Sequence, residues 1–302
     1  MERSPPSRHF CRSPPPGRSG FGLFSPRHAL VTGAAGTIGG ALVRTLSARH
    51  PELRFSLVDQ DAAGLTPLVR ELPGRSVALP WDLADIVTLP RLWERAVAEF
   101  GPIDLLINCA GFMEIRSFAA TPWELGERLL QVDLISPLRL MNLAVAALGG
   151  AAPVSDSSPA AGPPDPGSRA AVRGWIVNIS SMAGRVPLRG CSYYGAAKAG
   201  LAAASQVAGW ELAAAGIHVL TVLPGPVRSN LESRARAQVK PGLISRHIPT
   251  GDAVVLADRI ERALATARRR LVYPAFYGLA DRLVGTSSWI AANLGPAPTD
   301  AP

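Results

Sequence analysis

Tyr194 and Lys198 stand four residues apart in the segment Tyr-Gly-Ala-Ala-Lys. Residues at positions i and i+4 share one face of a helix, so the Lys198 ammonium is expected to lie near the Tyr194 phenol. An ammonium favours the phenolate and lowers the pKa of the phenol toward working pH, which suits general acid–base catalysis. Tyr193 has Ala197 at the same offset, so it has no such partner.

Two serines, Ser180 and Ser181, follow the apolar run 175–179, which predicts a buried strand. The end of that strand would place the Ser181 hydroxyl at the carboxyl edge of a sheet, where it can donate a hydrogen bond to a carbonyl oxygen. The alternative interpretation is that the two serines only cap a turn. The sequence therefore offers a proton-transfer pair and a polar group for orienting a substrate.

A glycine-rich turn, Thr32-Gly33-Ala34-Ala35-Gly36-Thr37-Ile38-Gly39, lies between an apolar run and a segment with helical spacing. Backbone N–H groups at a helix N-terminus attract a pyrophosphate. The glycines permit a tight turn and a close approach of phosphate to the backbone. The residues expected to hold the phosphates of a dinucleotide are Gly33, Gly36, Thr37, Ile38 and Gly39.

Asp59 ends the second apolar run, some twenty residues past the turn. A carboxylate there can accept hydrogen bonds from the adenosine ribose hydroxyls and would repel a 2′-phosphate. Its neighbour is Gln60 rather than Arg or Lys. The sequence therefore favours NAD as the cofactor over NADP, which it does not exclude.

The elements that must position these residues alternate between strand and helix. The runs that predict strands are 29–31, 55–58, 76–79, 103–107, 175–179 and 218–222, and those that predict helices are 38–46, 65–72, 89–100, 123–148, 193–215 and 253–269. The strands are apolar on both faces, which is typical of a parallel sheet covered by helices. We therefore predict an α/β fold with a doubly wound parallel sheet, forming one Rossmann-like catalytic domain over residues 28–302.

Composition limits the other classes of function. Residues 1–27 are rich in Pro, Ser and Arg and predict a disordered basic tail, and the small, polar run 149–174 predicts a flexible insertion. The formal charge of +8 comes in large part from that tail, so no nucleic-acid surface is expected. The three cysteines, Cys11, Cys109 and Cys191, lack metal-ligand spacing, so we expect no metal site and a reducing, cytoplasmic environment. No charge-free apolar run of about twenty residues indicates a membrane-spanning helix.

In their order along the chain, these features resemble the short-chain dehydrogenase/reductase family, in its short single-domain branch, over about residues 28–275. Asn108-Cys109-Ala110-Gly111 is similar to the family's Asn-Asn-Ala-Gly segment, and Ser181 lies thirteen residues before Tyr194, the separation typical of the catalytic pair. Further segments that match are Asp82-Leu83, which resembles the adenine-contacting position, and Pro224-Gly225-Pro226-Val227 with Ser229, which resembles the segment that meets the nicotinamide.

The resemblance implies roles for these residues. Tyr194 would exchange a proton with the substrate oxygen, Lys198 would bind the nicotinamide ribose, and Ser181 would orient the substrate. Hydride would pass to or from the nicotinamide ring, whose chemistry belongs to the cofactor. The cofactor contacts implied elsewhere are Asp82, Leu83, Asn108, Ala110, Gly111, Pro224, Gly225, Val227 and Ser229. The resemblance also implies a homodimer or homotetramer.

The chain departs from the family pattern at three places. Thr37 replaces the usual second glycine, and the resulting G-x-x-G-x-x-G spacing is similar to that of the extended branch, which includes epimerases. Asp133 stands where the family commonly has a catalytic Asn; an aspartate there can still hold the relay water, and its charge would alter the pH dependence. Cys109 replaces an Asn and is expected to pack as a small hydrophobe.

The C-terminal part governs the substrate in proteins of this kind. The segment 231–248 carries Arg234, Arg236, Lys240 and Arg246, and we interpret it as a solvated flexible loop rather than a site for an acidic substrate. The extension 271–302 begins after Arg268-Arg269-Arg270 and contains an apolar, aromatic run expected to be helical. It can cover the substrate cleft, join a subunit interface or make a peripheral membrane contact. All three readings suit an apolar small-molecule substrate.

The function that the sequence favours is hydride transfer between NAD(P) and a secondary alcohol or ketone. Two alternatives stay open. One is an epimerase-like enzyme of the extended branch that retains its NAD. The other is a regulatory protein that binds a dinucleotide without catalysis, for which the intact trio of Ser181, Tyr194 and Lys198 would be unnecessary.

Overall fold

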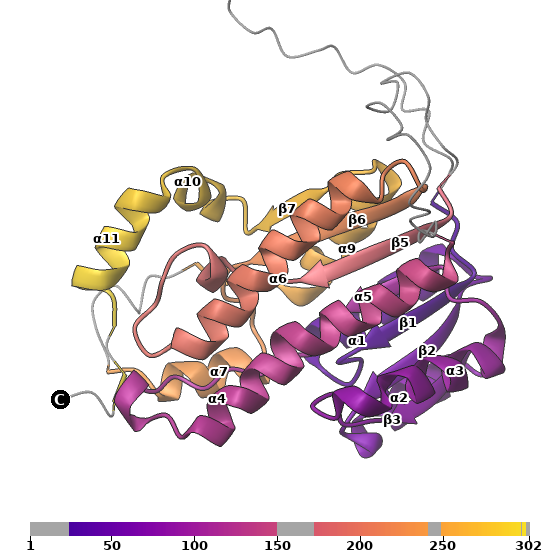
Figure 1. Cartoon of the computed structure of the whole chain (residues 1–302), viewed down its shortest axis with the longest axis horizontal. Coiled ribbons are helices and arrows are strands. Elements are labelled where there is room, and N and C mark those ends of the chain that lie inside the picture. The colour runs from indigo at the N-terminus through magenta and orange to yellow at the C-terminus, as the bar shows by residue number, and fades with distance from the viewer. Residues whose placement is uncertain (1–23, 150–171, 241–248, 297, 300–302) are drawn as a thin grey trace, which may run out of the picture.

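The computed structural model describes residues 24–149, 172–240, 249–296 and 298–299. Its centre is one sheet of seven parallel strands in the order β3-β2-β1-β4-β5-β6-β7 (Figure 1). The strands are β1 (His28–Thr32), β2 (Arg54–Asp59), β3 (Ser76–Pro80), β4 (Leu105–Asn108), β5 (Gly174–Ile179), β6 (Ile217–Pro224) and β7 (Arg270–Tyr273). The chain order reverses between β1 and β4, so the predicted doubly wound fold is confirmed.

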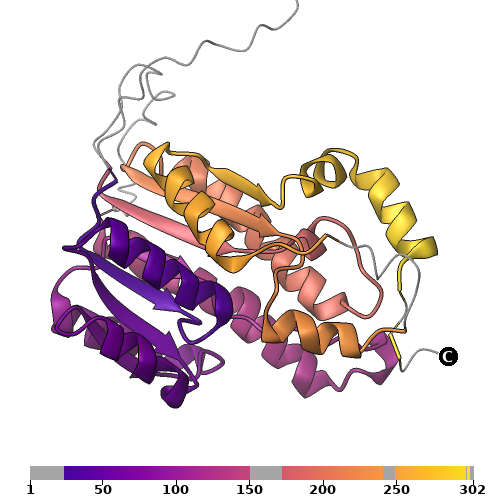
Figure 2. The same ribbon diagram turned by 180° about the vertical axis from the view of Figure 1, so that it is seen from behind.

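Helices cover both faces of the sheet. They are α1 (Thr37–Arg49), α2 (Ala62–Glu71), α3 (Leu89–Phe100), α4 (Trp123–Leu130), α5 (Ser136–Ala147), α6 (Ser192–Glu211), α7 (Asn230–Ala237), α9 (Ala253–Ala265), α10 (Tyr277–Arg282) and α11 (Val284–Leu294). Apolar side chains of α1, α2 and α9 share one core with the sheet, and those of α3, α5 and α6 share the other. Figures 1 and 2 show these two faces in turn.

The strands form because their apolar residues are buried on both sides. Every residue of β1, β4, β5 and β6 is buried. A parallel sheet needs such cover, since its crossover helices lie on its faces. The carboxyl ends of the strands therefore meet at one edge, and the loops that follow β1, β4, β5 and β6 lie together there.

The fold begins before His28. Phe24 is buried, and its ring packs edge-on against His50 and Trp175, with ring centroids 5.0 and 5.2 Å apart. The backbone N–H of Arg27 donates to the Asp104 carboxylate at 2.9 Å. The predicted tail is therefore wrong for residues 24–27, which belong to the domain. Residues 1–23, and 150–171 of the expected insertion, lie outside the described residues.

Two C-terminal expectations were also wrong in detail. The run that begins at Leu271 first adds β7 to the edge of the sheet, beside β6, and only then forms α10 and α11. The segment expected to be a flexible loop after Ser229 forms α7, whose N-terminus is capped by the Ser229 hydroxyl. Residues 241–248, which include Arg246, lie outside the described residues.

One stretch, Trp123–Ala147, is long and apolar enough to cross a membrane by length and composition alone. It comprises α4, a π-helical turn and α5. In the fold, α4 packs against α6, and α5 packs against α3. Asp133, in the middle of the stretch, is fully buried and paired with Lys198. We therefore interpret Trp123–Ala147 as a covering helix of the sheet.

Candidate active site

The structure brings three predicted residues together at the carboxyl edge. Tyr194 lies in the first turn of α6 and Lys198 one turn later, with the ammonium 5.8 Å from the centroid of the phenol ring. Ser181 follows β5, and its hydroxyl lies near the Tyr194 phenol, where it lowers the pKa of that phenol. The Ser180 hydroxyl donates to the Lys198 carbonyl at 2.6 Å, which fixes α6 against the end of β5. Tyr194 and Lys198 are both buried.

Asp133 completes this cluster with a second charge. Its Oδ1 lies 2.9 Å from the Lys198 Nζ, and both side chains are buried. Its Oδ2 accepts from the Phe112 N–H at 3.2 Å, while Lys198 Nζ also donates to the Ile179 carbonyl at 3.1 Å. Asp133 lies in the π-helical turn Gln131–Ile135, and such turns occur often at functional sites.

Gly111 is required by that arrangement. A Cβ added at Gly111 would lie 2.3 Å from Asp133 Oδ1 and 3.2 Å from Lys198 Nζ. Any side chain there would push the carboxylate away from the ammonium. The predicted Asn-Cys-Ala-Gly segment thus shapes the ion pair as well as the turn beside it.

The pKa of the Tyr194 phenol is raised in the structure, whereas the sequence predicted that it is lowered. Burial raises the pKa of Tyr194, Lys198 lowers it as expected, and the carboxylate of Asp133 raises it again. The net pKa is therefore raised, so the expected lowering was wrong. Burial likewise raises the pKa of Asp133. Burial opposes the charge of Lys198, but attraction to Asp133 and Tyr194 outweighs burial and raises the pKa of Lys198.

The glycine turn approaches the end of β4 closely. Gly33 has φ of +67°, and a Cβ there would lie 2.7 Å from the backbone of Ala110. Thr32, which the sequence analysis treated only as part of the turn, holds this contact. Its hydroxyl oxygen accepts from the N–H groups of Cys109 and Ala110, each at 3.1 Å. The signal available in the sequence was a hydroxyl at the last position of a buried strand.

The N-terminus of α1 suits an anion. Its N-cap is Gly36, which has no side chain to satisfy the first N–H groups of the helix, and no acidic residue lies in the first turn. Asp59 stands beside the turn. Its carboxylate accepts from the Ala35 N–H and the Asp61 N–H, each at 3.1 Å.

A further ion pair lies at the end of β3. Both carboxylate oxygens of Asp82 accept from Arg128 of α4, at 3.1 and 3.0 Å, and Asp82 also accepts from the Ala84 N–H. Leu83 is buried beside it. Arg128 was absent from the sequence-based prediction, because nothing in its local pattern marks the strand end that it faces.

Two residues of the Asn-Cys-Ala-Gly segment point elsewhere. Asn108 is buried and donates to Asn178 at 2.8 Å, so its side chain joins β4 to β5 instead of facing the cleft. Cys109 packs against the core, and burial raises the pKa of its thiol to about 12. That thiol stays protonated at neutral pH, as the packing interpretation requires.

The Pro-Gly segment begins at the last residue of β6. Gly225 packs against the ring of Tyr277 from α10, since a Cβ there would lie 2.6 Å from that ring. Val227 is buried and bridges to Gly251. The Ser229 hydroxyl accepts from the Glu232 N–H at 3.1 Å.

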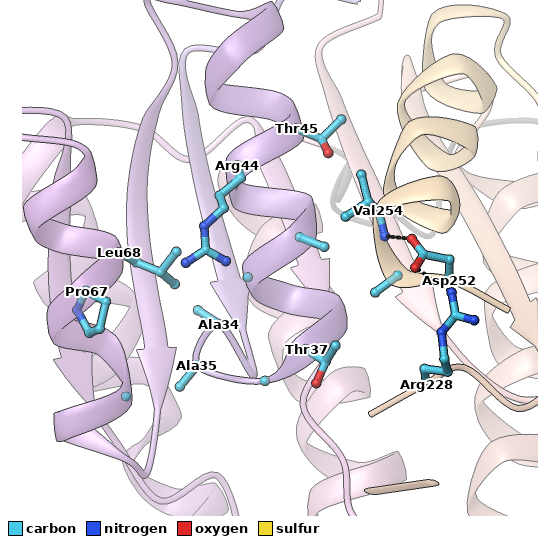
Figure 3. Close-up of a pocket in the computed structure, with 15 residues that line it drawn as sticks. Ala34, Ala35, Thr37, Arg44, Thr45, Pro67, Leu68, Arg228, Asp252 and Val254 are labelled. Atoms are coloured by element: carbon cyan, nitrogen blue, oxygen red, sulfur yellow. Dashed lines mark hydrogen bonds and ion pairs between the residues drawn. The ribbon is translucent and has the colours of Figure 1, made fainter. Parts of the chain in front are cut away.

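A groove of about 640 Å³ lies beside the glycine turn, between α1, α2 and the start of α9 (Figure 3). The trio of Ser181, Tyr194 and Lys198 does not line it. Its two arginines are paired with carboxylates, Arg44 with Glu71 and Arg228 with Asp252. Among the described residues, no cluster of metal-ligating side chains occurs.

Comparison with known proteins places this fold and site. A family model described as short chain dehydrogenase matches residues 27–158 and 166–240. The cis-4-hydroxycyclohexanecarboxylate dehydrogenase of Sinomonas cyclohexanicum is 31% identical over 227 residues, which cover 74% of this chain and 82% of that enzyme. A short-chain dehydrogenase from Sphingobium yanoikuyae, solved with NADPH, matches at a TM-score of 0.67 and 25% identity, covering 88% of this chain and 95% of the other.

The 3-ketoacyl-(acyl-carrier-protein) reductase from Brucella melitensis, solved with NADH, has a TM-score of 0.68 at 19% identity. The match covers 82% of this chain and 97% of that reductase, and it supports the fold alone. The fold and the site thus define a doubly wound α/β protein with Ser181, Tyr194, Lys198 and Asp133 clustered at the carboxyl edge of its sheet. The chain belongs to the short-chain dehydrogenase/reductase family. It is an oxidoreductase, as the sequence predicted.

Proposed function

We propose that this protein transfers hydride between a nicotinamide dinucleotide and a secondary alcohol or ketone, with Tyr194 as the general acid–base. The observation that carries the proposal is the buried cluster at the carboxyl edge. There, the Tyr194 phenol lies near the Ser181 hydroxyl and beside Lys198, whose ammonium is 2.9 Å from the Asp133 carboxylate.

The residues fit a dinucleotide. The uncapped N-terminus of α1 at Thr37, Ile38 and Gly39 would hold the pyrophosphate, because its N–H groups lack a side-chain acceptor. Asp82 and Leu83 would border the adenine, and Ala110 and Gly111 would contact the dinucleotide between Gly33 and Lys198. The segment from Pro224 to Ser229 would meet the nicotinamide. When bound, the nicotinamide supplies a carbon that donates or accepts hydride. The short-chain dehydrogenase from Sphingobium yanoikuyae, solved with NADPH, supports this class of ligand.

Tyr194 would move the proton that accompanies the hydride. Its raised pKa keeps the phenol protonated at neutral pH, the form that donates a proton to a carbonyl oxygen during reduction. In the oxidation of an alcohol, the phenolate accepts the hydroxyl proton. Ser181 would hold the same substrate oxygen by a hydrogen bond, and Lys198 would bind the ribose while its charge favours the phenolate.

Asp133 would act as a positioning residue that holds Lys198. Its carboxylate occupies the place of the Asn that the family pattern leads one to expect. Because its charge raises the pKa of Tyr194, it also sets the pH range of catalysis. We therefore propose that the pH dependence of this enzyme differs from that of a relative with Asn there.

Replacing Asp133 with Asn should shift the pH profile of alcohol oxidation to lower pH. The substitution removes a charge that disfavours the phenolate, so the base form of Tyr194 is populated at lower pH. The measurement is kcat/KM for oxidation between pH 6 and pH 10, with Asp85→Asn, at an exposed position, as a control. An Asp133→Asn profile that coincides with the parent profile would remove Asp133 from the relay.

Asp59 would select NAD over NADP. Its carboxylate lies against the glycine turn, bound to the Ala35 N–H, where it would repel a 2′-phosphate. Asp59→Asn keeps an acceptor of similar shape and loses the charge. We expect the ratio of kcat/KM for NADP to that for NAD to rise about tenfold, the equivalent of about 1.4 kcal/mol. Asp85→Asn serves as a control, and an unchanged ratio in Asp59→Asn would refute the assignment.

The substrate is proposed to be fairly apolar. Ala280 of α10 and Ala291 of α11 pack on a small cluster that contains Met182 and Val186, immediately after Ser181. The C-terminal helices therefore cover the side of the site where a substrate would lie. The Sinomonas relative is named for a cyclic secondary alcohol that also carries a carboxylate, so it supports a secondary alcohol as substrate but not its apolar character.

We further propose that the protein works in the cytoplasm as a homodimer or homotetramer. The two described cysteines, Cys109 and Cys191, are free thiols, which suits a reducing compartment.

A spectrophotometric screen tests the proposed function. Oxidation of secondary alcohols and reduction of ketones are followed by the nicotinamide absorbance with NAD(H) and NADP(H). We expect turnover with at least one apolar pair. Tight binding of NADH without turnover on any member of the panel would favour a regulatory protein, and NAD that co-purifies without net turnover would favour the epimerase-like alternative.

A further inference from the structure

The C-terminal helices expose five large apolar side chains. We call this surface the C-terminal apolar face; it consists of Phe276, Leu279, Leu283, Trp289 and Ile290, which are between 42 and 64% exposed. None of the described residues of α10 and α11 is fully buried. Figures 1 and 2 both show the two helices projecting from the body beyond the end of β7. An exposed apolar patch of this kind marks a contact surface.

The inner side of α10 is already used. Tyr277 packs on Gly225, and Ala280 packs on the cluster that follows Ser181. Phe276, Leu279 and Leu283 lie outside these contacts, since each is more than half exposed. A helix that is apolar on both sides is stable only when its second side is covered as well. The C-terminal apolar face therefore needs a partner.

Two exposed arginines border this face, Arg282 at the end of α10 and Arg270, which pairs with Asp281 of α10. Asp281 is the one acidic residue between positions 268 and 296, and it already pairs with Arg270 and Arg185. Its pairing with Arg270 shows that α10 folds back toward the arginine run. Asp281 thus offsets only one of the three arginines Arg185, Arg270 and Arg282, and an apolar, aromatic surface with a net positive border is typical of helices that lie in a membrane interface.

The charge distinguishes between two occupants. A second copy of the chain, docked through the same face around a two-fold axis, would bring the arginines of one copy near those of the other. Arg270 and Arg282 of each copy would then repel those of the other. An anionic lipid surface attracts the same arginines and accepts the apolar side chains below its headgroups.

We propose that the C-terminal apolar face docks on an anionic lipid bilayer. Trp289, Phe276 and the leucines enter the headgroup boundary, and the arginines contact the acidic headgroups. Because Tyr277 connects α10 to Gly225, the docked helices hold the substrate side of the protein close to the bilayer. The docking itself does not depend on the proposed reaction.

Vesicle flotation with the full chain tests the proposal. The vesicles are equimolar phosphatidylcholine and phosphatidylglycerol, compared with pure phosphatidylcholine. The test variant is the double substitution Phe276→Ser/Trp289→Ser. The control is Val87→Ser, which changes an equally apolar side chain that is 88% exposed in the helical turn before α3. Circular dichroism and the melting temperature of each variant show that the fold is retained.

We expect the parent and Val87→Ser to float with the anionic vesicles, and the double variant to bind them at least about tenfold more weakly. Binding of the parent should fall as salt is raised, because the arginines contribute. Failure of the parent to bind anionic vesicles overturns the proposal. A different pair of results would assign the face to a second copy. In that case the parent does not bind vesicles, and analytical ultracentrifugation shows a dimer of the parent that the double variant does not form.

Discussion

Tyr194→Phe is expected to lower kcat by about two to four orders of magnitude, the usual contribution of a positioned acid–base group. The substitution removes one hydroxyl and keeps the ring that fills the buried site, so the fold should be retained. The hydroxyl is the group that lies near Ser181 and that we propose to exchange the proton. Binding of NADH, measured by fluorescence titration, should change by no more than a few-fold.

Tyr193→Phe provides a matched control for this prediction. It makes the same chemical change one residue away, where the ring stacks on Phe118 with centroids 5.7 Å apart. Lys198 stands four residues from Tyr194 and not from Tyr193, so Tyr193→Phe should keep near-parental kcat. Equal activity in Tyr194→Phe and the parent would remove the phenol from the mechanism.

Lys198→Met is expected to lower both activity and stability. The substitution leaves the Asp133 carboxylate buried without its ammonium partner. Removing one member of a buried ion pair costs about 3–5 kcal/mol, because the remaining charge is uncompensated. The free energy of unfolding, from urea denaturation with an unchanged m-value, measures this loss. Activity should fall as well, since no cation then favours the Tyr194 phenolate.

A second substitution separates these two effects. Lys198→Met/Asp133→Asn should recover much of the lost stability, because no buried charge remains, while activity stays low. Arg95→Met, at an exposed position of α3, should change the unfolding free energy by no more than about 0.5 kcal/mol. If Lys198→Met were as stable as Arg95→Met, the buried ion pair would not hold the site together.

Much of the fold was predictable because the strands are buried on both faces. The run Trp175–Ile179 is apolar except for Asn178, and the predicted bounds of α3, Leu89–Phe100, are those observed. The edge strand β7 was missed because it has only four residues and its apolar run continues into α10. The packing of Phe24 was missed because its partners, His50 and Trp175, are distant in the sequence.

The site was predictable to the extent that local spacing determines it. The i, i+4 rule relates Tyr194 to Lys198, and the strand end before Ser181 places its hydroxyl beside them. The protonation of Tyr194 was not predictable, because it depends on burial and on Asp133, which reaches the site through a π-helical turn of another helix. Arg128 and Thr32 act through contacts between segments far apart in the chain, which no local pattern reveals.

A crystal structure of the protein with NADH tests the central claim most directly. The claim is that Tyr194, Lys198 and Ser181 converge on the reactive end of a dinucleotide whose phosphates rest on the start of α1. We expect the pyrophosphate on the N–H groups of Thr37–Gly39, the ribose on Lys198, and the nicotinamide between Tyr194 and the Pro-Gly segment. Density for NADH in any other place, or a nicotinamide beyond reach of a substrate held by Tyr194 and Ser181, would contradict the account.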